Sequence, residues 1–543
     1  MIRTEKLIAF LLGIFIPFLL TAYTGEVHSS FKTPGNFPTG LTFDGTNIWI
    51  ADRGTDQLYQ LNRETGQIIR KISSPGYWPE GLAWDGQYLW NVDIKGGLPL
   101  AENYDGSIYK INPDDGMILH TIKSPTNSPR GLCWDGKFLW CVDSQKDQII
   151  QFDPNDGTTI KSFKSPASDP RGITFDGKYL WVSDRVSNQL YMVDPKTGWV
   201  LIVADAPGEF TVDLCFDGKF IWAADHEKKE IFKLKINDGV NFSRTKPVRA
   251  KITYTHQTTN FGPGKVKELN IHLALPKNRD NQIIEQDFEY TSSPTTIVTD
   301  KWGQNTARFL YMNLAAGQNR TISLITRASI FDVRYYIYPE NVGSMSSIPK
   351  EIKSLYLKDD IKYQINHPLI KSALNEAIGD EKNPYWITRK IYQYLMTKLY
   401  YEMVGGWNTA PTVLERGNGS CSEYTFVYIS MCRAAGIPAR YVGSVVIRGD
   451  MNAMDDVFHR WVEVYLPNYG WIPVDPSGGD SDSPQHQANY FGHLNNRYLV
   501  TTESGGGSET LDWTYNSHQF WSTLPKTLVV FENYADWEAI LTK

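Results

Sequence analysis

The chain has 543 residues, which is enough for about three or four domains of ordinary size. Its formal net charge is −6, so overall charge gives no reason to expect binding to nucleic acid or to anionic lipid. Five cysteines are too few for a disulfide-dense scaffold, and their odd number leaves at least one thiol unpaired within a monomer.

Residues 1–22 have the layout of a secretory signal peptide. Arg3 and Lys6 precede an apolar run from Leu7 to Leu20, and small residues follow near Ala22. The run is shorter than the ~20 residues of a membrane-spanning helix, although an uncleaved anchor is the alternative. We therefore expect an exported protein, in the periplasm, the cell envelope or outside the cell, with no other membrane contact.

Residues 23–240 carry five copies of one pattern, such as GLTFDGTNIWIAD. Each copy places Asp-Gly, a strong hairpin signal, between two strand-like runs, and two more strands follow. The copies recur roughly every 41 residues, with one insertion after Asp93, and four strands in this length predict a propeller blade. The first aspartates of the copies are Asp44, Asp85, Asp135, Asp176 and Asp217.

The ends of this region predict how the ring closes. Residues 25–33 resemble the fourth strand of a blade, and the fifth copy lacks a good fourth strand of its own. Pairing the two ends would remove open edges, so we predict five blades closed by the N-terminal strand, with a sixth, degenerate blade as the alternative. The units resemble NHL-type propellers, which implies a protein or a cell-wall ligand as a candidate partner.

A second aspartate ends the second strand of every copy. A structural interpretation makes each one a turn cap, and a functional one makes them a ring of metal or ligand contacts. We favour turn caps because a repeat copies structural residues into every blade. The five are Asp52, Asp93, Asp143, Asp184 and Asp225. Cys133 and Cys215 occupy equivalent repeat positions and are expected to be buried, small apolar residues.

Residues 246–340 read as short strands separated by Gly, Pro and Asn turns, with no helical period. This pattern predicts a β-sandwich, which we interpret as a spacer. The overall fold class is therefore a mainly β, multidomain chain with an α+β region at residues 350–500. We expect residues 501–543 to pack on that region as a C-terminal extension, with strands in 496–516 and a short helix in 532–543.

The stretch GNGSCSEYTFVYISMCRAAGIP contains the two cysteines of the α+β region. Its apolar run predicts a buried helix that ends at Gly436, before Pro438. Cys421 would then lie at the helix start, where free N–H groups and the helix dipole favour a thiolate. Cys432 would lie about three turns further on, packed in the core.

A base for Cys421 is available in two strands joined by LPNYG. His459 opens the first strand and Asp475 closes the second. A five-residue loop would pair Tyr465 with Trp471 and place Asp475 diagonal to His459, within reach of its side chain. A four-residue loop would turn Asp475 to the opposite face. Taken singly, such a histidine and such an aspartate are more often structural.

Three blocks of residues 380–480, GxCSEYxxxxxxxxRAAGIPARYV, HRWVEVYL and GWIPVDPS, together resemble the transglutaminase-like superfamily, which has a papain-like fold. The resemblance implies a catalytic triad of Cys421, His459 and Asp475 that attacks an amide and forms a thioester. It also implies an oxyanion-binding tryptophan, for which Trp407 is the candidate and Trp386 its rival. Arg433 and Arg440 match the pattern in structural positions.

These residues predict an exported cysteine enzyme that acts on protein or peptide amides, with the propeller as a recruitment module. Hydrolysis and acyl transfer to an amine stay open. The alternative is an adhesion or scaffold protein with a non-catalytic, relict core. No cofactor is implied, and His486 and His493 lack a convincing third metal ligand.

Overall fold

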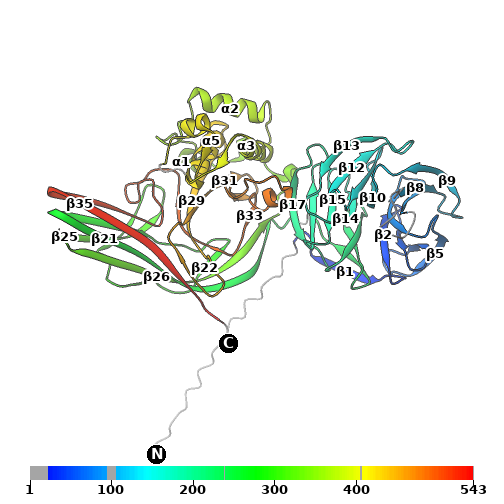
Figure 1. Ribbon diagram of the computed structural model, residues 1–543, viewed down its shortest axis with the longest axis horizontal. Coiled ribbons are helices and arrows are strands. Elements are labelled where there is room, and N and C mark those ends of the chain that lie inside the picture. Colours follow the sequence, from blue (N-terminus) through cyan, green and yellow to red (C-terminus); the bar gives the residue numbers. More distant parts are fainter. Residues whose placement is uncertain (1–22, 95–105, 238, 404–406, 542–543) are drawn as a thin grey trace, which may run out of the picture.

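The structure is a computed structural model that describes residues 23–94, 106–237, 239–403 and 407–541. The predicted signal peptide and nearly all of the repeat insertion lie outside these ranges. Figure 1 shows the propeller at one end of the molecule, a long sheet at the other, and a helical region that lies above the sheet and next to the propeller.

The propeller consists of five four-stranded sheets within the described residues. Each of the first four is built from consecutive strands, because tight turns join them into antiparallel meanders. In chain order the sheets contain β2 (Pro38–Phe43), β3 (Ile48–Asp52), β4 (Gln57–Leu61) and β5 (Ile68–Ser73); β6 (Pro79–Trp84), β7 (Leu89–Ile94), β8 (Gly106–Ile111) and β9 (Ile118–Lys123); β10 (Pro129–Trp134), β11 (Leu139–Asp143), β12 (Gln148–Phe152) and β13 (Thr159–Lys164); β14 (Pro170–Phe175), β15 (Leu180–Asp184), β16 (Gln189–Val193) and β17 (Val200–Asp205).

The fifth blade confirms the predicted closure. Its strands are β18 (Thr211–Phe216), β19 (Ile221–Asp225), β20 (Glu230–Leu234) and the N-terminal β1 (Val27–Lys32). β1 pairs antiparallel with β20, from Val27 opposite Leu234 to Lys32 opposite Glu230. The innermost strand β18 also contacts β2, so the first and last blades meet and the ring is complete.

The repeated aspartates hold turns and tryptophans in place. Oδ2 of Asp44 accepts the indole N–H of Trp49 at 2.9 Å, and its Oδ1 accepts two backbone N–H groups of the Asp-Gly turn. The second aspartate of a repeat bridges two loops: Asp184 accepts the backbone N–H of Asp169 and that of Ser187. The turn-cap interpretation is confirmed at these positions. Cys133 and Cys215 are buried, as predicted.

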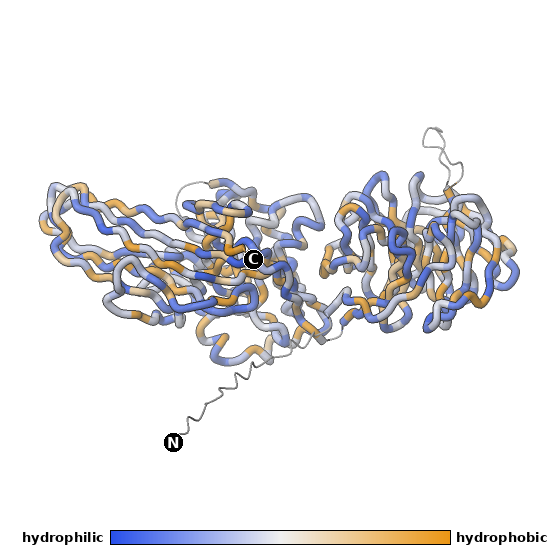
Figure 2. Tube along the Cα trace, turned by 90° about the horizontal axis from the view of Figure 1, so that it is seen from below, coloured by the Kyte–Doolittle hydropathy of each residue, from blue (hydrophilic) through white to orange (hydrophobic). Residues whose placement is uncertain are grey.

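Strands follow the propeller, as predicted, but in place of the two separate sheets of a sandwich they belong to one hydrogen-bonded sheet, and they are far longer than expected. Two predicted strands are one element, β21, which bends through 33 residues and pairs first with β26 and then with β25. Within the described residues the sheet has nine strands: β21 (Phe242–Ala274), β22 (Gln282–Ile284), β23 (Glu289–Tyr290), β24 (Thr296–Thr299), β25 (Asn305–Leu314), β26 (Asn319–Tyr335), β30 (Asn452–Asp455), β33 (His493–Leu494) and β35 (Ser517–Ala539). Figure 2 shows hydrophobic and hydrophilic residues alternating along these strands.

The expectation for the C-terminal segment is confirmed in its first part, because β34 (Tyr498–Ser504) pairs with β29 (Ala439–Val446) in the sheet of the α+β region, and it is wrong for the strand β35 that follows. Residues 532–539 are not helical but belong to β35, and β35 extends the long sheet rather than packing on the α+β region as a separate extension. It pairs with β21 from Leu273 opposite Ser517 to Ala250 opposite Ala539. Burial explains the difference, because Ala535 and Trp537 alternate with exposed residues and fill the core of this sheet.

The α+β region places a buried helix, α5, against a four-stranded sheet ordered β32-β31-β29-β34. Helix α3 begins after Asn383, whose side chain caps it by accepting backbone N–H groups of the first turn. The elements are the 3₁₀ turns η1 (Pro339–Asn341) and η2 (Met345–Ser347); α1 (Lys350–Tyr356), α2 (Pro368–Ile378), α3 (Pro384–Lys398), α4 (Ala410–Arg416), α5 (Cys421–Ala434) and α6 (Pro484–Ala488); the short parallel pair β27 (Tyr400–Tyr401) and β28 (Asn418–Gly419); and β29 (Ala439–Val446), β31 (His459–Leu466), β32 (Gly470–Val474) and β34 (Tyr498–Ser504).

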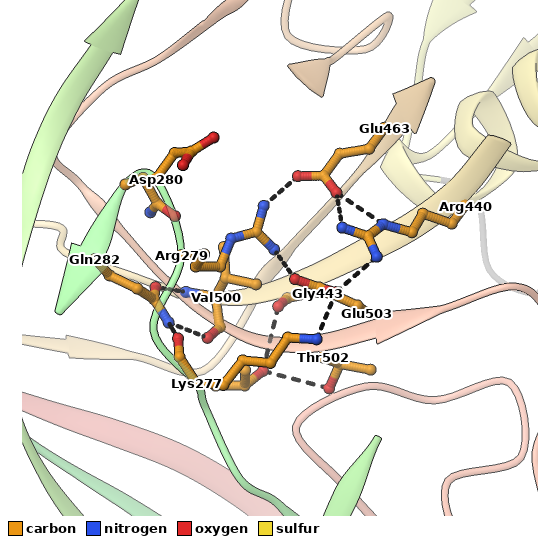
Figure 3. Close-up of polar contacts among 12 residues, drawn as sticks. Lys277, Arg279, Asp280, Gln282, Arg440, Gly443, Glu463, Val500, Thr502 and Glu503 are labelled. Carbon is orange, nitrogen blue, oxygen red and sulfur yellow. Dashed lines mark hydrogen bonds and ion pairs between the residues drawn. The ribbon is translucent and has the colours of Figure 1, made fainter. Parts of the chain in front are cut away.

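A buried ion network joins the α+β region to the long sheet (Figure 3). Arg440 on β29 pairs with Glu463 on β31 and with Glu503 on β34, both at 2.7 Å. Arg279, from the loop after β21, pairs with the same two carboxylates, and Lys277 adds a contact to Glu503. Burial opposes ionisation of Glu503, but these cations outweigh it and hold its pKa at about 2. The network therefore fixes β31 relative to the sheet, and the structural role expected for Arg440 is confirmed.

The propeller contacts the α+β region through its fourth blade. Helix α6 packs on β17, and the Gln485 side chain donates to the Tyr191 hydroxyl at 2.7 Å. Arg389 on α3 also donates to the carbonyl of Val200 at 3.1 Å. None of the helices in the described ranges has the length and apolar character that crossing a bilayer requires.

Candidate active site

Cys421 is the first residue of α5, as the sequence predicted. Ser420 caps the helix, and Glu423 completes a capping box by accepting the backbone N–H of Ser420 at 3.2 Å. The capping box fixes where the helix begins. The thiol therefore lies beside the first-turn N–H groups, which carry the positive end of the helix dipole.

The two cysteines of α5 differ in exposure and in acidity. Cys421 is partly exposed, whereas Cys432 is fully buried. Burial raises the pKa of the Cys432 thiol well above its usual range. Burial also opposes ionisation of Cys421, but a hydrogen bond to His459 and the charge of that ring outweigh it, so the pKa of Cys421 lies below its ordinary value. All five cysteines of the chain are free thiols.

The hairpin of β31 and β32 has the predicted register. Tyr465 lies opposite Trp471 and Val462 opposite Val474, so the chain beyond β32 brings Asp475 diagonal to His459. His459 Nε2 lies 2.6 Å from Asp475 Oδ2. Because Nε2 is engaged there, Nδ1 is the ring nitrogen available for the Cys421 thiol. The structure thus brings together all three residues that the sequence put forward.

Asp475 uses its two oxygens for different purposes. Oδ1 accepts the backbone N–H groups of Ser477 at 3.1 Å and Gly478 at 2.9 Å, together with the Ser477 hydroxyl at 2.8 Å. Oδ2 contacts His459. The structural interpretation of this aspartate as a turn former and the functional one as a partner of histidine therefore both hold, each through one oxygen.

The electrostatics of the pair favour a charged imidazole. Burial opposes protonation of His459, but the Asp475 carboxylate and its hydrogen bond outweigh burial and raise the pKa of His459 to about 10. Burial likewise opposes ionisation of Asp475, and the positive ring outweighs it, so the pKa of Asp475 lies below its usual value. Together with the lowered pKa of Cys421, these shifts favour a thiolate–imidazolium pair at neutral pH.

A cleft of about 610 Å³ opens over the three residues. Its walls are mainly aromatic and apolar, and Arg448 is the one Lys or Arg side chain among the described residues that line it. Trp407 lines this cleft, whereas its rival Trp386 lies on α3 and packs against Trp199 of the propeller. The remaining lining residues are Tyr401, Met403, Ser420, Ser422, Val446, Val457, Phe458, Gly478, Tyr490, Tyr498 and Tyr515.

Sequence reasoning gave no role to Glu423, which ties Trp407 to the helix start. The Glu423 carboxylate is fully buried and accepts the backbone N–H of Asn408 at 3.0 Å and its side-chain amide at 2.8 Å. Arg416 pairs with the other oxygen at 2.8 Å. The S-x-x-E spacing of Ser420 and Glu423 is a capping-box signature and could have revealed this residue.

The described residues contain no group of three or more His, Cys, Asp or Glu side chains arranged to hold a metal ion. His486 bonds to the carbonyl of Gly478 at 2.8 Å, and His493 pairs with Asp332 at 3.1 Å.

A cysteine at a helix start, with a histidine and an aspartate on an adjacent hairpin, is the arrangement of one class of domain. A comparison with known families identifies the same class. Residues 372–476 match the family model of the transglutaminase-like superfamily, so the chain contains a transglutaminase-like domain. This class of domain is that of a cysteine-based enzyme.

Two relatives and one solved structure show how much of the chain resembles known proteins. A protein-glutamine gamma-glutamyltransferase of Pseudomonas aeruginosa is 36% identical over 67 residues, which are 11% of this chain and 10% of that protein. The protein YebA of Bacillus subtilis is 31% identical over 83 residues, 13% of this chain and 11% of that protein. The chain thus spans only about a tenth of either relative. A putative cysteine protease of Cytophaga hutchinsonii superposes with a TM-score of 0.39 at 15% identity, covering 56% of this chain and 94% of that one.

Proposed function

We propose that this chain is an exported cysteine enzyme that cleaves amide bonds of proteins or peptides through a thioester on Cys421. The observation that carries the proposal is the hydrogen-bonded series from Cys421 through His459 to Asp475 on the wall of a cleft. A helix-start thiol with a lowered pKa and an oriented imidazole is the arrangement that nucleophilic catalysis by cysteine needs.

In the proposed reaction the thiolate of Cys421 forms a bond to the amide carbonyl carbon. The resulting oxyanion lies near the first-turn N–H groups of α5 and near Trp407, which lines the same cleft and whose indole N–H is a candidate donor. Collapse of the intermediate breaks the C–N bond, and the leaving amine takes the proton from His459. Asp475 holds the ring in the required tautomer and supports its charge.

The thioester is then resolved by a second nucleophile. Attack by water, with His459 as base, releases a carboxylate, and attack by an amine forms a new amide. The cleft walls are mainly aromatic and apolar, which supports a substrate whose reacting group is a neutral amide. Incubation with a glutamine peptide and a labelled amine measures the ratio of the two products.

We assign substrate recruitment to the propeller. The segment that follows Asp475 supports this assignment. It leads directly into α6, and α6 packs on blade four of the propeller. Tyr77 and Val186 are 84% and 67% exposed, in loops at the same end of the propeller. Replacing both with serine should raise KM for a protein substrate and leave turnover of a short peptide unchanged.

The decisive experiment compares Cys421→Ala with Cys432→Ala. The wild type and Cys432→Ala should be labelled by iodoacetamide or by a glutamine-mimicking probe, and Cys421→Ala should not. Incubation with a glutamine peptide and a labelled amine then separates transfer from hydrolysis. Equal labelling of wild type and Cys421→Ala would refute the assignment, and labelling without any turnover would favour a scaffold protein with a relict core.

A further inference from the structure

Arg460 follows His459 on β31 and points to the opposite face of the strand. Its side chain is fully buried, and its guanidinium lies over four aromatic rings. The distances to the ring centres are 4.8 Å for Trp407, 5.3 Å for Phe426, 4.5 Å for Tyr441 and 4.5 Å for Tyr515. Ring faces are partially negative, so this aromatic cage attracts and fixes the cation.

No carboxylate neutralises this cation among the described residues. Nη2 donates to the carbonyl of Trp513, and neither Nε nor Nη1 has an acceptor. Arg440, on the neighbouring strand β29 and with a side chain that is 11% exposed, instead forms ion pairs with Glu463 and Glu503. A buried guanidinium without a partner anion is unfavourable, and aromatic faces offset only part of that cost.

The candidate anion for Arg460 is the thiolate of Cys421 itself. Trp407 and Tyr515 form one wall of the cage and also line the cleft that contains Cys421. Phe426, below the cation, lies on α5 five residues after Cys421. The backbone N–H of Arg460 also donates to the Cys421 sulfur, and the Arg460 charge helps to lower the pKa of that thiol, after the larger effects of burial and His459.

A count of charges indicates what the cation does. In the reactive form the thiolate and the Asp475 carboxylate are negative and the His459 ring is positive, which leaves one net negative charge in a largely buried site. Arg448 on the cleft wall does not change this count, because it pairs with Asp455 at 2.7 Å. Arg460 brings the group to neutrality. We propose that Arg460 is a positioning residue whose caged charge is the counter-charge of the Cys421 thiolate, an inference that rests on the nucleophile assigned in the proposed function.

The test separates charge from packing by comparing Arg460→Gln with Arg460→Lys in the full chain. The readout is the second-order rate constant for iodoacetamide at Cys421, followed by mass spectrometry of the Cys421 peptide from pH 5 to 9. We expect Arg460→Gln to shift the profile upward by about one pH unit, which is a roughly tenfold loss of rate on the acidic side. Arg460→Lys should keep the wild-type profile within about threefold, because it keeps the charge.

Arg433 provides the matched control. It is also a buried arginine over an aromatic ring, 4.6 Å from the centre of Tyr363, and it bonds to carbonyl oxygens, but it lies at the far end of α5. Arg433→Gln should lower the melting temperature and leave the alkylation profile unchanged. An equal shift in Arg433→Gln would mean that loosened packing explains the result, and it would overturn the proposal.

The proposal for Arg460 would also be overturned if a folded Arg460→Gln variant kept the wild-type dependence of alkylation on pH. If Arg460→Gln does not fold, Arg460→Lys decides, because a charge-based role requires the lysine variant to keep the wild-type profile and a one-unit rise contradicts it. The alkylation readout needs no substrate. Failure of the proposed function would appear as alkylation without turnover, and failure of this inference as a profile that ignores Arg460.

Discussion

The turn aspartates of the propeller and Asp475 of the β31–β32 hairpin are alike in one respect, since each accepts backbone N–H groups of the loop that follows it. In Asp184 the second oxygen accepts another backbone N–H, from Asp169, so both oxygens serve the fold. In Asp475 the second oxygen contacts His459. The same turn motif therefore becomes part of a reactive site when one carboxylate oxygen is left for a side chain that can carry a proton.

The largest expected effect concerns that oxygen. Asp475→Asn keeps an acceptor for the Ser477 and Gly478 N–H groups but removes the negative charge from His459. We expect kcat to fall by about 10⁴, as for the equivalent change in serine proteases, with little change in melting temperature. Amidase or acyl-transfer kinetics would measure it, with Asp184→Asn as a control that keeps wild-type kcat. A loss of less than about tenfold would mean that Asp475 only forms the turn.

The next largest effect is expected at Trp407. Trp407→Phe keeps an aromatic face over Arg460 and removes the indole N–H. If this N–H binds the oxyanion, kcat should fall by about 10²–10³, the usual consequence of losing one oxyanion donor, while KM stays near its wild-type value. Trp386→Phe, on the surface of α3 that faces the propeller, should leave kcat unchanged. Equal losses in the two variants would remove the basis for choosing Trp407.

The pH dependence of Cys421 alkylation should show whether His459 keeps the thiol ionised. Because the pKa of Cys421 is lowered and that of His459 is raised to about 10, the thiolate–imidazolium pair persists across neutral pH. The stabilisation from a protonated His459 is complete below the ordinary histidine pKa of ~6.5 and is lost as pH rises towards the folded value. Wild-type alkylation should therefore vary little from pH 6 to 9.

In His459→Gln the thiol loses its partner while burial still opposes ionisation. Its alkylation rate should then rise about tenfold for each pH unit in the same range, as for an ordinary thiol below its pKa. Stopped-time iodoacetamide labelling at Cys421 would measure both profiles. A wild-type profile as steep as that of the variant would show that the resting site holds a neutral thiol.

The propeller was predicted from short-range patterns, whereas the triad was predicted from the register of one hairpin together with the resemblance of three blocks to the transglutaminase-like superfamily. Asp-Gly turns define the blades, and the odd loop between Tyr465 and Trp471 fixes which face Asp475 takes. The C-terminal strand was missed because it pairs with β21, which lies roughly half a chain length earlier, and local residues do not encode such a pairing. The cage around Arg460 was invisible for a similar reason, since its rings come from four separate segments.

The smallest effect on the reactive site is expected from replacing the propeller aspartate Asp184. Asp184→Ala leaves the buried N–H of Asp169 and that of Ser187 without their acceptor, at a cost of ~1–3 kcal/mol for each group that water cannot reach. Hydrogen exchange in β14–β16 should become faster, and the melting temperature should fall. Cys421 alkylation should stay at the wild-type rate, because the turn that Asp184 caps belongs to a different domain from the hairpin of His459. A change in the alkylation profile would instead mean that blade four, through α6 and the segment after Asp475, transmits strain to the triad.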